Sequence, residues 1–164
     1  MAVAMLGFGN ARDNGTVYDK DRSGLMEKWS PNKKYVALFD FAKQGKTTVF
    51  KVRPDGKRAE QWEWIWTRYG YSHEACLSDD GQYLAIPYQH YRPDRSGYDP
   101  EENMLTILNR GKIAVTVKFS KLADIFSKLA PETFERSWGH AKGFSEKNEF
   151  MVDTYSGEIG RAHV

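Results

Sequence analysis

The histidines are the first residues in this sequence that could do chemistry. His73 and His140 each stand five residues before the serine of a similar turn motif, at Ser78 and Ser145. They could therefore lie on one rim and share a ligand or a metal ion. We favour a structural hydrogen bond to the turn backbone, because no third metal ligand stands at a suitable spacing. We expect no metal site and no cofactor, and keep both histidines as candidate binding residues.

A polar segment over residues 88–103 is the second candidate site. Its candidate binding residues carry phenol, imidazole or carboxylate groups: Tyr88, His90, Tyr91, Asp94, Tyr98 and Asp99. Long loops on a rigid sheet often carry binding sites, although a solvated loop without a function is the simpler interpretation. A hydrolase would need two acids at a defined separation, one of them held protonated by an apolar pocket. The acids available for that role are Asp94, Asp99, Glu101 and Glu102.

A row of tryptophans offers a third possibility for binding. Trp62, Trp64 and Trp66 alternate with other residues, so they fall on one face of a predicted strand. An exposed row could stack on sugar rings. We favour the interpretation that the row is the buried face of an amphipathic strand.

Composition limits the class of protein. The chain has 164 residues, enough for one domain with an adequate core, and its formal net charge is +2. Lys and Arg are scattered among the acids, which argues against a nucleic-acid-binding protein. No stretch approaches the roughly 20 apolar residues of a membrane-spanning helix. Cys76 is the only cysteine, so it has no disulfide partner in the chain and is expected to be a small buried hydrophobe.

A turn followed by a strand occurs three times. The motif reads SPNKKYVA, SDDGQYLA and SEKNEFMV, beginning at Ser30, Ser78 and Ser145. Ser, Asp, Asn and Pro shape a reverse turn, and Gly81 or Asn148 can take the left-handed conformation that closes it. The aromatic and aliphatic residues that follow predict a strand. We therefore expect three equivalent strands that begin with inward-pointing aromatic residues, at Tyr35, Tyr83 and Phe150.

These motifs resemble the S-P-D-G-[KR]-Y-[LV]-A repeat of β-propeller blades, as in the WD-type, YVTN-type and TolB-type families. The resemblance covers about half of the chain, and it departs from the WD pattern because no Trp-Asp dipeptide closes a repeat. It implies a mainly antiparallel all-β fold of two to three propeller-like blades, incomplete or open. The overall layout resembles small bacterial secreted proteins built from such repeats, and this resemblance implies no particular activity.

Other segments fill in the predicted elements. Strands are expected over residues 47–53 and 58–69, followed by a hairpin of strands 104–109 and 113–119. The second hairpin strand alternates, and the residues expected on its buried face are Ile113, Val115, Val117 and Phe119. A short helix is expected over 121–129, capped by Ser120 and stopped by Pro131.

Both ends of the sequence indicate a fragment. Residues 1–11 are apolar and end in small residues, which fits either a truncated signal peptide or a first strand over Ala2–Phe8. Ile159–Val164 back-translates into a sequence that resembles a common sequencing-library adapter, so we expect an artificial tail. Residues 12–158 would then form one β-repeat domain. The protein would be periplasmic or secreted if 1–11 is a signal remnant, and cytoplasmic otherwise.

Two classes of function remain. The one that we favour is a non-enzymatic binding or scaffold module whose partner is a protein or a glycan. The other is a hydrolase-like enzyme or enzyme fragment that uses the carboxylates of the 88–103 loop. The placement of those carboxylates distinguishes the two, since a catalytic acid needs a partly buried position in a shared pocket. The oligomeric state is not predicted.

Overall fold

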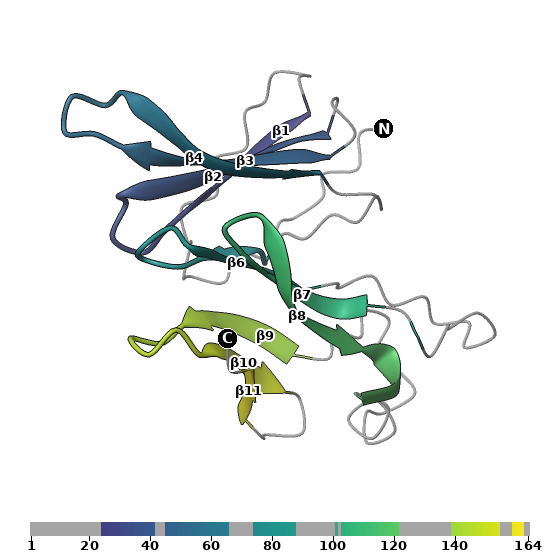
Figure 1. The fold of residues 1–164 in the computed structure, drawn as a ribbon. Coiled ribbons are helices and arrows are strands. Elements are labelled where there is room, and N and C mark those ends of the chain that lie inside the picture. Colours follow the sequence, from purple (N-terminus) through teal and green to yellow (C-terminus); the bar gives the residue numbers. More distant parts are fainter. Residues whose placement is uncertain are drawn as a thin grey trace, which may run out of the picture.

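The computed structural model describes residues 24–41, 45–65, 74–87, 101, 103–121, 139–154 and 159–162. In these ranges the regular elements are strands with one short 3-10 helix, and every strand pairing is antiparallel. Figure 1 shows the strands in three groups, purple to blue, teal to green, and yellow. The predicted all-β, antiparallel fold class is therefore confirmed.

The first sheet contains strands β1 (Leu25–Trp29), β2 (Tyr35–Asp40), β3 (Lys46–Val52) and β4 (Arg58–Ile65). Each strand pairs with the next one along the chain, in the order β1-β2-β3-β4. Gly56, with a φ of 78°, closes the turn between β3 and β4. The strands predicted over 47–53 and 58–69 are thus β3 and β4.

The second sheet repeats this order. It contains β5 (Cys76–Leu77), β6 (Tyr83–Pro87), β7 (Asn103–Asn109) and β8 (Lys112–Lys118), in the order β5-β6-β7-β8. A 3-10 helix, η3 (Phe119–Lys121), follows β8. The helix predicted over 121–129 otherwise lies outside the described residues.

The predicted burial of Ile113 is wrong, since this side chain is 59% exposed. Val115 and Val117, two residues of the same predicted face, do pack against a core. The register of β7 and β8 shifts between Ile107 and Leu108, which breaks the alternation of β8. The extra residue in β8 therefore separates Ile113 from the row of valines.

The third sheet contains β9 (Gly139–Phe144), β10 (Phe150–Thr154) and β11 (Ile159–Ala162), in the order β11-β10-β9. The pairing of β9 and β10 shifts register between Met151 and Val152. β11, which pairs with β10, lies in the segment that the sequence assigns to an artificial tail.

The middle sheet carries the core on both of its faces. Towards the first sheet it presents Ala75, Leu77, Leu84, Ile86 and Leu108, which pack with Met26, Ala37, Phe39 and Val49. Towards the third sheet it presents Cys76, Ala85, Met104, Leu105 and Ile107, which pack with Phe150 and Val152. The strands that open the sheets lie side by side, β1 against β5 and β5 against β9. The two apolar interfaces hold the sheets in the stack that Figure 1 shows.

The three repeated turns share a hydrogen-bond pattern, and the third closes one residue earlier than the first two. The backbone N–H groups of Ser30, Ser78 and Ser145 bond to the carbonyls of Tyr35, Tyr83 and Glu149, and each serine carbonyl accepts from the residue three positions later. That later residue is left-handed in every turn, with φ values of 60°, 70° and 60° at Lys33, Gly81 and Asn148. The assignment of Gly81 and Asn148 is confirmed, whereas Lys33 is a residue type that rarely adopts this conformation.

The aromatic residues that follow the turns begin β2, β6 and β10, as predicted. Phe150 is fully buried, and Tyr35 is half-buried against the core between the first and second sheets. The Tyr83 ring lies 6.0 Å from the Phe144 ring, measured between centroids. These rings therefore point into the interfaces between sheets.

Candidate functional site

The turn of the first sheet docks on the turn of the second. The backbone N–H of Asn32 donates to Asp79 Oδ1 at 2.8 Å, and Asn32 Nδ2 donates to the Asp79 carbonyl at 2.8 Å. The Tyr35 ring lies directly over Gly81, so close that a Cβ on Gly81 would lie 2.3 Å from Tyr35 Cδ1. Trp62 Nε1 donates to the Gly81 carbonyl at 2.8 Å. Residues of two strands, β2 and β4, and of two turns thereby fix how the first two sheets meet.

A cavity of about 300 Å³ lies where the three turns converge. The first sheet contributes Trp29 and Pro31, the second contributes residues 75–80, and the third contributes residues 142–146 and Asn148. The cavity is therefore bordered by β5, by β9 and by all three copies of the motif. Its volume suits one sugar ring or one amino-acid side chain rather than a larger ligand.

The lining of the cavity combines polar and apolar residues, and its charged residues are mainly acidic. Asp79, Asp80 and Glu146 supply carboxylates, and Ser78 and Ser145 supply hydroxyls, while Trp29 and Phe144 supply rings. Lys142 is the basic residue of the lining, and its ammonium group forms an ion pair with Asp153 at 2.5 Å. The carboxylates therefore outnumber the basic groups around this cavity.

The two aspartates also hold the turns together. Asp80 Oδ1 accepts from Ser78 Oγ at 2.6 Å and from the Gln82 backbone N–H at 2.9 Å. Asn32 occupies the matching place in the first turn, where its Oδ1 accepts from Ser30 Oγ and from the Lys34 N–H, both at 2.9 Å. Glu146, in contrast, is an exposed residue of the third turn. It is therefore the acid of the lining that can be changed with least effect on the fold.

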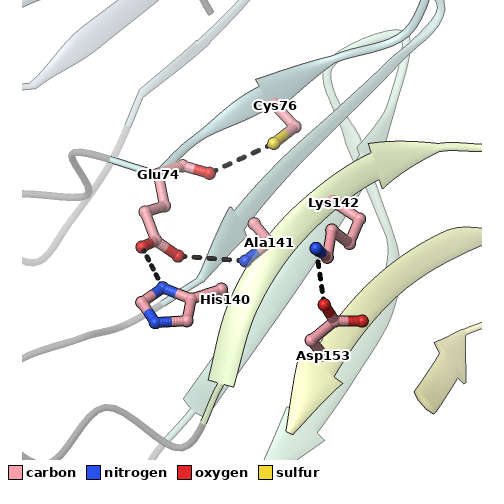
Figure 2. A network of polar contacts seen from close by, with 6 residues as sticks. All are labelled: Glu74, Cys76, His140, Ala141, Lys142 and Asp153. Atoms are coloured by element: carbon pink, nitrogen blue, oxygen red, sulfur yellow. Dashed lines mark hydrogen bonds and ion pairs between the residues drawn. The ribbon is translucent and has the colours of Figure 1, made fainter. Parts of the chain in front are cut away.

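Glu74 connects the second sheet to the third beside this cavity. Its Oε2 accepts from the Ala141 backbone N–H at 3.1 Å, and its Oε1 lies 3.3 Å from His140 Nδ1. Figure 2 shows Glu74 reaching from the start of β5 to β9, with the Lys142–Asp153 ion pair further along β9. The Glu74 side chain thus spans the junction of the two strands.

Cys76 lines the cavity but is not prepared to act as a nucleophile. It is 8% exposed, and Sγ donates to the Glu74 carbonyl at 3.3 Å. Burial raises the pKa of the Cys76 thiol to about 12. Because the thiolate is the reactive form, the thiol is unreactive near neutral pH. The prediction that Cys76 is a small buried hydrophobe is confirmed.

Of the candidate binding residues, the structure describes His140. It is an exposed residue of β9 that contacts Glu74, and it is not one of the residues that line the cavity. The other candidates lie outside the described residues: His73, Tyr88, His90, Tyr91, Asp94, Tyr98 and Asp99. Within the described ranges no three His, Cys, Asp or Glu residues lie close enough together to hold a metal ion. No helix in this part of the chain is long and apolar enough to span a membrane.

The tryptophan row belongs to the core where the structure describes it. Trp62 and Trp64 pack against the core between the first and second sheets. Trp66 lies outside the described residues. The interpretation as a buried strand face is therefore confirmed for the first two tryptophans.

Sequence reasoning missed the residues that line the cavity. The turn motifs predict a scaffold, so nothing in them marks Asp79, Glu146 or Lys142 as residues of a site. The repetition itself is a signal for such a site, since turns at equivalent ends of packed sheets lie near one another. Comparison with protein-family models, with curated proteins and with solved structures finds no match to this chain.

Proposed function

We propose that this chain is a non-enzymatic binding module of propeller-like blades, which holds its ligand in the cavity between the three repeated turns. The ligand is one unit of a glycan or one side chain of a partner protein. In the same proposal, the module belongs to a bacterial protein that works in the periplasm or outside the cell.

The arrangement of the strands supports the propeller-like part of this proposal. The first two sheets are four-stranded antiparallel meanders, and the strands β1, β5 and β9 that open the sheets are neighbours. Propeller blades are four-stranded sheets of this kind, placed around a central channel. The cavity borders β5 and β9 and therefore occupies the place where such a channel would run.

The convergence of the three turns on one cavity is the observation that carries the binding function. The lining combines carboxylates and hydroxyls with aromatic rings, and sites for small ligands combine polar and apolar groups in this way. Each lining segment is anchored to a packed sheet, so the site needs little reorganisation on binding.

The alternative function, a hydrolase that uses the 88–103 loop, gains no support from the acid that can be located. The Glu101 side chain is 73% exposed and lies 3.9 Å from Lys118 Nζ. A general acid needs an apolar environment that favours its protonated form. The other acids considered for this role lie outside the described residues.

The test is a ligand screen with a matched pair of variants. The ¹⁵N-labelled protein is titrated with monosaccharides, disaccharides and short peptides, while its amide resonances are followed by NMR. A true ligand should shift the resonances of residues 78–80 and 145–148. Glu146→Ala should weaken binding by about five-fold or more, as expected for the loss of a charged hydrogen bond.

Glu60→Ala is the control, because Glu60 is an exposed acid on β4 and does not line the cavity. It should bind the ligand as the unmodified protein does. The proposed site is wrong if every ligand found affects only resonances of residues outside the three turns. It is also wrong if each ligand binds Glu146→Ala and Glu60→Ala equally well.

A further inference from the structure

Strand β8 is an unpaired edge of the second sheet within the described part of the chain. The sheet order ends at β8, and its partner on the inner side is β7. An edge strand directs alternate N–H and C=O groups away from its sheet, where they can pair with an added strand. The seven residues of β8 are long enough for such pairing.

The first half of β8 is open to solvent. Lys112, Ile113 and Ala114 are all exposed, and Ile113 is exposed to 59%. Ile113 and Ile65 are the large apolar side chains of the described residues that remain exposed. Burying a side chain such as Ile113 under a partner is favourable, because it removes apolar surface from water.

The residues of β8 and its flanks carry charges of one sign. Residues 110–121 contain four basic residues and no acid, in a chain whose Lys and Arg residues are almost balanced by Asp and Glu. The basic residues are Arg110, Lys112, Lys118 and Lys121. Two acids of the described residues lie near the ends of β8: the Glu101 carboxylate is 3.9 Å from Lys118 Nζ, and the Glu63 backbone lies against Gly111. A partner strand with acidic residues at its ends would therefore complement this edge.

The same charges disfavour a second copy of the chain as the partner. If two β8 strands paired antiparallel about Val115, Lys112 of each would lie opposite Lys118 of the other. Like charges directly opposite in a sheet are destabilising. Lysines at a strand edge are also a known protection against such self-association.

We propose that the β8 edge binds an extended acidic peptide by strand addition. The peptide pairs its backbone with the outer N–H and C=O groups of β8. Its β-branched centre covers Ile113, and its acidic ends pair with the lysines at the two ends of the strand. This site is separate from the cavity between the turns and does not depend on the function proposed for it.

Three synthetic peptides test this proposal by fluorescence polarisation. The first is acetyl-Glu-Asp-Thr-Val-Thr-Val-Asp-Glu-amide, extended by a C-terminal fluorophore. The second carries Lys in place of each acid. The third keeps the acids but has Pro in place of both valines, because Pro removes backbone donors and prevents strand pairing. The first should bind at least about ten-fold more tightly than the others, since it alone has both the charge and the backbone pattern.

Protein variants locate the site. Lys112→Glu should weaken binding of the first peptide by about five-fold or more, and Lys112→Gln by less, as expected for an exposed ion pair. Lys57→Glu makes the same charge change on a lysine that is 78% exposed in the turn before β4, and it should bind as the unmodified protein does. Hydrogen exchange should show that amides of β8 become protected when the acidic peptide is added.

Several results would overturn the proposal. Equal binding of the acidic peptide and the proline peptide would mean that charge alone attracts them. A single-stranded DNA oligomer that binds as tightly as the acidic peptide would lead to the same conclusion. Protection of every β8 amide in the free monomer would mean that the chain itself covers the edge. A dimer that forms through β8 without peptide would identify a second copy as the occupant.

Discussion

The replacement of Gly81 by Ala tests the contact on which the docking of the first two sheets depends. An alanine Cβ at this position would lie 2.3, 2.6 and 2.7 Å from three atoms of the Tyr35 ring. These distances are far below van der Waals contact, so the ring or the turn must move. Overpacking of this kind costs about 1–3 kcal/mol.

The backbone adds a second cost. Gly81 has a φ of 70°, and a left-handed conformation costs a residue with a side chain about 1–2 kcal/mol. The free energy of unfolding of Gly81→Ala should therefore fall by about 2–5 kcal/mol in all.

Gly56→Ala separates the two costs. Gly56 has a φ of 78°, and a Cβ built there has nothing within 4 Å. Gly56→Ala should therefore lose only the backbone part, about 1–2 kcal/mol. Urea unfolding followed by circular dichroism measures both variants, provided that the slope of the transition is unchanged.

The difference between the two variants is the contribution of the Tyr35 contact. In a Tyr35→Ala background, Gly81→Ala should cost no more than Gly56→Ala does, because the ring is gone. If the two glycine variants lose equal stability while Tyr35 is present, the ring does not lie on Gly81, and the docking of the turns is described wrongly.

Three further predictions concern single residues. Folding raises the pKa of the Cys76 thiol from 9.0 to about 12, so the unfolded chain loses this proton at a lower pH than the folded protein does. The free energy of unfolding should therefore fall by about 1.4 kcal/mol per pH unit between pH 9 and pH 12. Urea unfolding at several pH values measures this slope, which Cys76→Ala should lack. Lys33→Gly should raise the melting temperature or leave it unchanged, because it relieves about 1–2 kcal/mol of left-handed strain and costs about 0.5–1 kcal/mol in chain entropy. A lower melting temperature contradicts the turn geometry. Asn32→Ala should lose about 1–2 kcal/mol of stability, because the Asn32 side chain also bonds to the second turn. Asp55→Ala should lose less, because the Asp55 side chain bonds to the backbone of its own turn. Equal losses would show that Asn32 does not hold the second turn.

The repeated turns could be predicted from the sequence because their signals are local. Gly81 and Asn148 are residue types that accept a positive φ, and each is followed within two residues by an aromatic strand start. Lys33 gave no such signal, since lysine rarely adopts this conformation. Its place in the turn follows from the Asn32 side chain. Asn32 Oδ1 accepts from the Ser30 hydroxyl and from the Lys34 backbone N–H, and Asn32 Nδ2 donates to the second turn.

The features that the sequence did not predict depend on long-range packing. The exposure of Ile113 results from a register shift between β7 and β8, and no residue of β8 predicts this shift from the sequence. The cavity exists because turns far apart in the chain converge on it, and a repeat pattern does not specify how the repeats pack. The position of His140 before a turn suggests a binding residue. In the structure His140 contacts Glu74, which precedes β5 of another sheet, and no sequence motif predicts this contact.

The most direct test of the central claim is a set of proton–proton NMR contacts across the two interfaces between sheets. Contacts are expected between the Tyr35 ring and the α-protons of Gly81, and between the rings of Tyr83 and Phe144. Their presence would establish that the turns of three sheets meet around one cavity. A spectrum with sharp, dispersed strand resonances that lacks either set of contacts would show that the sheets form without docking through these turns.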